Sequence, residues 1–131
     1  MKTYWDSSAL IEALHDQKIR SRIKPSDNAT RPHSLAEVFS TLTKGGLNFR
    51  YPPADAAKMI EDLARDLQFV ELSSVDTLDA IKAASAQGVR GARIHDLIHA
   101  QAAKNYGADV LLTLDHAGFS TLKLSARVER P

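Results

Sequence analysis

The sequence predicts a three-layer α/β/α fold, with a mostly parallel sheet between two layers of helices. Strand-like and helical segments alternate along the chain, which is the order that builds parallel sheets. Residues 109–114 form a near-continuous apolar run, as expected of a strand buried on both faces. An acidic residue follows this strand and another follows the first predicted strand, and such positions gather at one edge of a parallel sheet.

The length of 131 residues fits one domain, 1–131, and the composition excludes several classes of protein. The absence of cysteine removes any disulfide framework, thiolate zinc site or thiol nucleophile, and it fits a reducing interior. No apolar run approaches the roughly 20 residues that cross a bilayer, and the amino terminus lacks the basic-then-apolar order of a signal peptide. We therefore expect a cytoplasmic protein without a membrane partner.

The net charge of +1 means that binding to nucleic acid would depend on a local basic patch. Residues 17–31 are rich in lysine and arginine, whereas residues 55–79 are rich in aspartate and glutamate. Each run is an ordinary solvated face by default. The basic run is the better candidate for contact with a polyanion.

The first strand and helix meet at Asp6. Residues 3–5 favour a strand, Ser7 and Ser8 favour a helix start, and residues 9–14 favour a helix. In parallel α/β sheets, ligands bind at the carboxyl ends of the strands, beside helix N-termini. Asp6 is therefore either a functional acid or a cap on the following helix, and this stretch alone does not separate the two.

Glu37 lies in the second predicted helix. Residues 25–28 predict a turn, and a short unassigned segment, residues 29–31, follows it. The helix then carries one apolar stripe of Leu35, Val38, Phe39 and Leu42. Glu37 lies on the opposite face. It also follows Ser34 by three residues, which is the pattern of a capping box, so a structural role is equally open.

The middle of the chain and its tail are predicted to be scaffold. We expect a helix over residues 56–67, a short strand over 68–72 and a further helix from 73 to about 86. Residues 125–131 are expected to add an edge strand. We assign no chemistry to these segments.

Asp96 lies inside the helix predicted over residues 93–103. Its nearest neighbours on the helix are the small residues Ala92, Ala100 and Ala103, where a solvated face would carry long polar side chains. We therefore expect this helix to be packed on both sides, with Asp96 buried or in a cleft and in need of a partner. Asp115 then ends the apolar strand, before a turn at residues 116–119.

Four acids, Asp6, Glu37, Asp96 and Asp115, thus stand at strand ends or in early helical turns. If they converge, their charges raise one another's pKa unless a cation neutralises them. Oxygen ligands without cysteine suit Mg²⁺ or Mn²⁺. Such a site can bind a phosphodiester, activate water and stabilise the leaving oxygen.

These segments together resemble the PIN domain, and specifically the VapC-type toxins of type II toxin–antitoxin modules. The resemblance covers nearly the whole chain, in the order and spacing of the family. The segments that carry it are residues 4–10, 35–38, 93–100 and 112–115, with Phe119.

The resemblance implies a Mg²⁺- or Mn²⁺-dependent ribonuclease that acts on RNA. Asp6, Asp96 and Asp115 would hold metal, and Glu37 would position a second metal or the attacking water. Thr113 would orient the last carboxylate. The resemblance further implies a homodimer, and a cognate antitoxin that inserts a segment into the acidic cleft.

Several other polar residues lie near the predicted site. Arg90 and Arg93 are candidate phosphate contacts, although a solvated role is as reasonable. His95 and His99 have the spacing of a zinc-binding pair on a helix, but four carboxylates favour a harder ion. We expect these histidines to pack, hydrogen-bond or contact RNA, and assign no role to His116.

Two rival functions remain. A phosphoacceptor domain also gathers acids at strand ends, but it would require an acid pair at the first strand and a lysine soon after the last, whereas the first lysine after Asp115 is Lys123. The second rival is a catalytically silent PIN-like module that binds RNA or protein. The sequence alone leaves that alternative open.

Overall fold

The computed structural model describes residues 1–46 and 48–131. Within them, one five-stranded sheet has the strand order β3-β2-β1-β4-β5, and every neighbouring pair is parallel. Its strands are β1 (Thr3–Trp5), β2 (Asn28–Thr30), β3 (Gln68–Phe69), β4 (Val110–Leu112) and β5 (Arg127–Glu129). The predicted α/β fold with a parallel central sheet is confirmed.

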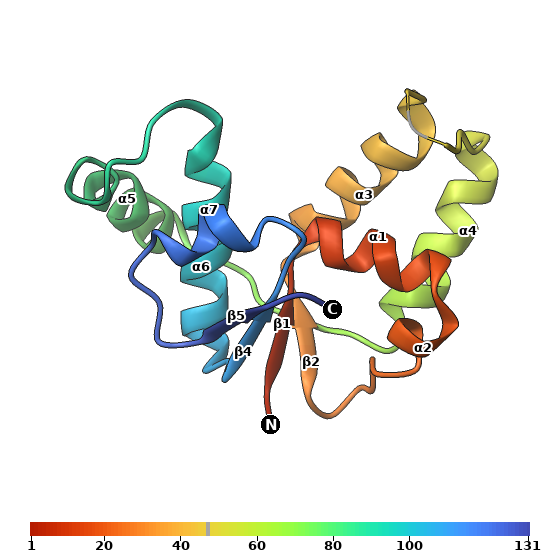
Figure 1. The fold of residues 1–131 in the computed structure, drawn as a ribbon, viewed down its shortest axis with the longest axis horizontal. Helices are drawn as coiled ribbons and strands as arrows, with labels where there is room; N and C mark the ends of the chain where they lie inside the picture. The colour runs from red at the N-terminus through yellow and green to blue at the C-terminus, as the bar shows by residue number, and fades with distance from the viewer. Residues whose placement is uncertain (47) are drawn as a thin grey trace.

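Helices cover both faces of this sheet (Figure 1). One face carries α1 (Ser7–His15), α2 (Gln17–Arg20), α3 (Pro32–Lys44) and α4 (Pro53–Ala64), and the other carries α5 (Ser74–Ala83), α6 (Ile94–Tyr106) and α7 (His116–Ser120). Two short 3-10 turns, Ser85–Gln87 and Gly91–Arg93, lead into α6. No helix in the described part of the chain is long and apolar enough to cross a membrane.

Alternating side chains of the central strands divide the core into two halves. Trp5 and Leu112 are fully buried against the layer of α1, α3 and α4, whereas Tyr4 and Leu111 are fully buried against α5, α6 and α7. Tyr4 pairs with Leu111, and Trp5 pairs with Leu112. This register aligns the carboxyl ends of β1 and β4 at one edge of the sheet.

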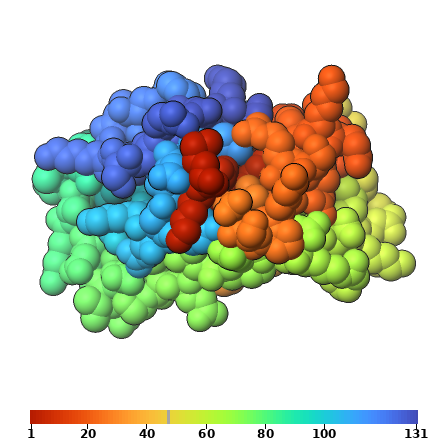
Figure 2. Space-filling model, turned by 90° about the horizontal axis from the view of Figure 1, so that it is seen from below, coloured from red at the N-terminus to blue at the C-terminus, as the bar shows by residue number. Residues whose placement is uncertain are grey.

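Figure 2 views the opposite edge, from the amino ends of the strands. The first residues, in red, lie between the orange segment that leads into β2 and the blue segment that leads into β4, as the strand order requires. The chain therefore enters the sheet at its centre, and residues that follow β1 lie at the middle of the carboxyl edge.

The structure differs from the prediction in three elements. Asn28–Thr30 is a central strand rather than an unassigned segment after a turn. Residues 116–120 form the helix α7 instead of a turn, because Asp115 caps it. The strand predicted over 68–72 is paired only at Gln68–Phe69, whereas the edge strand expected in the tail is present as β5.

The predicted capping box at Ser34 and Glu37 is wrong. Helix α3 begins three residues earlier than a capping box at Ser34 would require, at Pro32, and its N-cap residue Arg31 makes no side-chain capping bond. Pro32 starts the helix because its fixed φ and missing N–H suit the first helical position. Ser34 is instead fully buried, with its Oγ 2.8 Å from Thr30 Oγ1, so the capping alternative for Glu37 is removed.

Candidate active site

Asp6 lies at the carboxyl end of β1 and is 6% exposed. Its backbone N–H donates to Leu112 O (3.1 Å), which continues the pairing with β4. Its Oδ1 accepts from the backbone N–H of Ala9 (2.9 Å) and from the Ser8 hydroxyl (2.7 Å). Asp6 therefore does cap α1, and the capping uses one carboxylate oxygen.

Asp115 occupies the matching position beyond β4. Its Oδ1 accepts from the backbone N–H of Gly118 (3.1 Å) at the start of α7. Its own backbone N–H donates to Thr113 Oγ1 (2.9 Å), and Thr113 is fully buried. Thr113 thus fixes the backbone of Asp115, whereas the family resemblance had implied a direct effect on the carboxylate.

Ser8 connects these two strand ends, and sequence reasoning noticed it only as a helix-starting residue. Its hydroxyl donates to Asp6 Oδ1 and accepts from the backbone N–H of Leu114 (2.9 Å). Its Oγ also lies 3.5 Å from Thr113 Oγ1. The serine two residues after Asp6 therefore ties the first acid to the segment that carries Asp115.

Asp96 lies in the first turn of α6 and is half-buried. Burial raises the pKa of Asp96, and the negative charges of Asp115 and Asp6 raise it further, against the opposing effects of His99 and Arg93. The three aspartates therefore share one electrostatic environment. As predicted, Ala100 and Ala103 are buried, whereas Ala92 is exposed.

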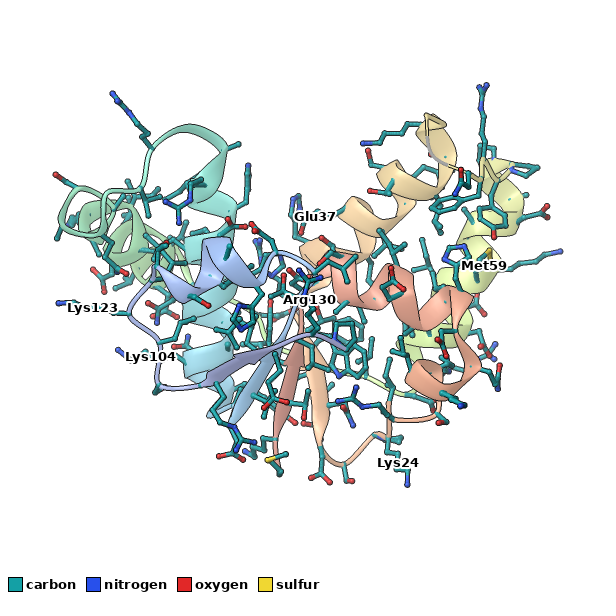
Figure 3. The ribbon with its side chains drawn as sticks, in the orientation of Figure 1. Lys24, Glu37, Met59, Lys104, Lys123 and Arg130 are labelled. Atoms are coloured by element: carbon teal, nitrogen blue, oxygen red, sulfur yellow. The ribbon has the colours of Figure 1, made fainter. Side chains whose placement is uncertain are left out.

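Glu37 approaches the same edge from α3, and Figure 3 labels it there, on the side that faces α6. Its Oε1 lies 3.1 Å from His99 Nε2. Burial alone would raise the pKa of Glu37, but the hydrogen bond and charge of His99, together with His33 and Arg31, lower it below its ordinary value. Glu37 is therefore ionised at neutral pH.

The two arginines predicted as phosphate contacts differ in their surroundings. Arg93 donates to Gly118 O (3.1 Å) and to Thr121 Oγ1 (2.8 Å), so it anchors α7 against the start of α6. Arg90 is exposed beside the 3-10 turn. Arg93 is thus partly engaged in contacts within the protein, whereas Arg90 remains exposed to solvent.

The histidine pair does not form a zinc site. His95 is exposed, whereas His99 is 3% exposed and has both ring nitrogens within hydrogen-bond distance of other residues. His116 is exposed and lies 3.2 Å from Ser120 Oγ through its Nδ1. The sequence analysis expected that His99 could pack and hydrogen-bond, but it did not predict Tyr4 and Glu37 as the partners.

The four acids fit a hard divalent cation by donor type and by charge. They offer only carboxylate oxygens, and the pKa of Asp96 is raised first by burial and then by the charges of Asp115 and Asp6, whose repulsion a cation would relieve. Among residues 1–46 and 48–131, no group of three or more histidine, aspartate or glutamate side chains is already placed to hold a metal ion. The match to a cation is therefore one of donor type and charge, and the side chains would have to move closer together to bind it.

A polar pocket of about 410 Å³ opens beside Glu37. It is lined by Ser7, His33, Ala36, Glu37, Ser40 and Thr41. Ser7 directly follows Asp6, so this pocket adjoins the acidic edge. It lies between α1 and α3, and both His33 and Glu37 line it.

A comparison with models of protein families identifies the family that the sequence resembles. The sequence model of the PIN domain matches residues 3–123. The chain belongs to the PIN domain family. No curated protein sequence matches it significantly.

Three solved structures share the fold of this PIN domain. PAE2754 from Pyrobaculum aerophilum is 21% identical, with a TM-score of 0.71 over 98% of this chain and 90% of the other. VapBC2 from Rickettsia felis, bound to a DNA fragment from its promoter, is 15% identical, with a TM-score of 0.74 over 99% and 98%. VapBC-1 from nontypeable Haemophilus influenzae is 16% identical, with a TM-score of 0.70 over 99% and 98%. Family membership supports the nuclease class expected from the sequence.

Gly118 gives a first test of how this PIN domain places Asp115. A Cβ at position 118 would lie 2.8 Å from Asp115 Cγ, closer than real contacts allow, so Gly118→Ala must displace the carboxylate. We expect the loss of this cap to lower the free energy of unfolding by about 1 kcal/mol, although alanine is normally the better helix former. Urea denaturation measures the change.

The neighbouring substitution Ala117→Gly is the matched control, because Ala117 is exposed in the same helix. It measures helix propensity alone. If Gly118→Ala stabilises the protein by the amount that Ala117→Gly costs, then Asp115 does not depend on the glycine.

Proposed function

We propose that this PIN domain is a VapC-type toxin, a Mg²⁺- or Mn²⁺-dependent endoribonuclease that hydrolyses RNA and is neutralised by a cognate antitoxin. The observation that carries the proposal is electrostatic. Burial, followed by the charges of Asp115 and Asp6 at two adjacent strand ends, raises the pKa of Asp96 on α6, and this supports a site that the three acids share. The VapBC structures of similar fold support the toxin class.

Asp6, Asp96 and Asp115 would hold the cation, with Glu37 beside them. A bound divalent ion supplies positive charge for the phosphodiester and lowers the pKa of water. Glu37 cannot donate a proton at neutral pH, because its pKa is lowered. It would instead accept a hydrogen bond from the attacking water and orient that water. Ser8 and Thr113 would hold the backbone around the acids.

A cleavage assay tests the proposal. Purified protein is incubated with a panel of structured RNAs, with and without Mn²⁺, beside the Asp6→Asn variant. We expect cleavage that requires both the ion and Asp6. Equal cleavage by the variant would indicate a contaminating nuclease. RNA binding without cleavage under any condition would indicate the catalytically silent module instead.

The antitoxin would be a protein that inserts a segment into the acidic cleft, as the family resemblance implies. A basic side chain in that segment would neutralise the repulsion that raises the pKa of Asp96. Co-purification with the product of an adjacent small reading frame is the expected result. The complex should lack the ribonuclease activity of the free protein.

We further propose a homodimer that uses α5. Val75, Leu78 and Ile81 are 63%, 52% and 50% exposed, and their spacing of three residues places them along one face of the helix. Exposed apolar stripes of this kind mark protein contacts. This stripe is the support within the chain for the dimer expected of the family.

Leu78→Glu is expected to weaken the dimer at least about a hundredfold, because it places a charge in an apolar contact. Sedimentation over a range of concentrations measures the dissociation constant. Ala57→Glu, at an exposed position of α4, adds the same charge elsewhere and should leave the dimer intact. An unchanged dissociation constant in Leu78→Glu would exclude α5 as the interface.

A further inference from the structure

His99 is a buried polar residue that the proposed chemistry does not use. It lies on α6, one helical turn after Asp96, and is 3% exposed. Its Nε2 lies 3.1 Å from Glu37 Oε1 on α3, and its Nδ1 lies 2.7 Å from the Tyr4 hydroxyl on β1. One imidazole thus joins the central strand, the helix of Asp96 and the helix of Glu37.

The chemistry of Glu37 fixes the direction of one of these hydrogen bonds. An ionised carboxylate only accepts, so Nε2 of His99 must carry the hydrogen that faces Glu37. The Tyr4 hydroxyl is fully buried, and burial raises its pKa, so it keeps its proton. It can therefore donate to Nδ1 of a neutral imidazole, and it can accept from Nδ1 of a protonated one, so in either state a chain runs from Tyr4 through His99 to Glu37.

We propose that His99 is a positioning residue, which holds the Glu37 carboxylate in place beside the three aspartates while Tyr4 fixes the imidazole ring. The inference rests on the proposed nuclease function and deepens it. Glu37 has three side-chain torsions and is only half-buried, so packing alone does not fix it. A phenylalanine or leucine would fill the same space without binding the carboxylate.

The placement of a catalytic carboxylate matters because a displacement of about 1 Å can lower a rate by about a hundredfold. The expected effect of His99→Phe is therefore a fall in kcat of about a hundredfold, with KM within about threefold of the wild type. A loss of RNA binding would raise KM instead. The division between kcat and KM separates positioning of Glu37 from a contact with substrate.

The conservative variant His99→Gln tests whether loss of the hydrogen bond to Glu37 causes the fall in kcat. In His99→Gln, the amide nitrogen can take the place of Nε2 as the donor to Glu37. We expect its kcat to be at least about tenfold higher than that of His99→Phe. Tyr4→Phe keeps the His99 N–H but removes its support, and an intermediate loss is expected. Lys104→Gln, at an exposed position near the other end of the same helix, is the control and should cleave RNA like the wild type.

A measurement without metal or substrate separates this inference from the proposed function. The ¹⁵N spectrum of the metal-free protein should show His99 with its hydrogen on Nε2, and Tyr4→Phe should change the Nδ1 signal. The crystal structure of His99→Gln should keep the side-chain torsions of Glu37, and that of His99→Phe should not. These results hold even if the wild type cleaves no RNA, in which case only the proposed function fails.

Four outcomes would overturn the inference. They are a hydrogen on Nδ1 instead of Nε2 in the wild type, unchanged Glu37 torsions in His99→Phe, a folded His99→Phe variant with unaltered kcat, and equal activity loss in His99→Gln and His99→Phe. If His99→Phe does not fold, the inference is overturned by a Tyr4→Phe variant with the kcat and the Nδ1 signal of the wild type, or by altered Glu37 torsions in His99→Gln. Circular dichroism and the Tm establish which variants are folded.

Discussion

Replacing Asp6 with asparagine is expected to lower the rate of RNA cleavage by at least about a thousandfold without unfolding the protein. Asparagine keeps the oxygen that accepts from Ala9 N–H and the Ser8 hydroxyl, and it caps helices as well as aspartate does. It removes the negative charge that would hold a divalent cation. Loss of several kcal/mol of charge stabilisation corresponds to a rate effect of this size.

Asp6→Ala separates the two roles of the side chain. It should lose the same activity and, in addition, about 1 kcal/mol of stability, because the cap is removed as well. Cleavage rates and urea denaturation of both variants give the comparison. If Asp6→Asn cleaves RNA as fast as the wild type, Asp6 is only a cap and the proposed site is wrong.

Asp96→Asn is expected to abolish cleavage and yet to stabilise the metal-free protein at neutral pH. Burial, followed by the charges of Asp115 and Asp6, raises the pKa of Asp96 in the folded state above its unfolded value. Between these two values the folded state binds more protons, so the wild-type free energy of unfolding falls as pH rises through this interval. Asparagine carries no such penalty.

The stability difference between Asp96→Asn and the wild type should therefore be smallest in acid, grow as pH rises through this interval, and stay constant above the raised pKa. Urea denaturation in a chelating buffer, repeated across this pH range, measures it. A variant that loses stability at neutral pH would contradict the repulsion. It would show instead that the Asp96 carboxylate makes a stabilising contact in the folded protein.

Mn²⁺ should reverse the order of stability, so that the wild type becomes more stable than Asp96→Asn. At a concentration of 100 times the dissociation constant, a ligand of the folded state adds about 2.7 kcal/mol of stability. We expect the Tm of the wild type to rise with Mn²⁺ and that of Asp96→Asn to remain unchanged. Asp55→Asn, at an exposed position of α4, is the control and should respond like the wild type.

The local sequence was sufficient for most of the fold, because its signals act over short distances. The run before Asp115 predicted a buried parallel strand, and β4 pairs on both sides. Asn28–Thr30 was missed because three residues show no periodicity, and only pairing with β1 and β3 makes them a strand. The capping box at Ser34 failed because Pro32 starts the helix earlier.

For the site, sequence placed the acids on the right elements but left their roles open. Asp6 was either a cap or a functional acid, and the structure shows that the cap uses one oxygen while the residue stands beside Asp96 and Asp115. The sequence singled out His99 by its spacing from His95 but gave no sign of its partners. Its partners are 95 and 62 residues away in the chain, so no local pattern could connect them.

The sequence by itself determined the layers, the parallel sheet and the identity of four acids, since hydrophobic periodicity and residue chemistry are properties of short segments. Only the tertiary structure decided which neighbours those acids have. The register of β1 against β4 brings two strand ends together, and packing of α6 against α3 adds the histidine. Contacts between distant segments depend on how the whole core packs, and that information is absent from any single stretch of the chain.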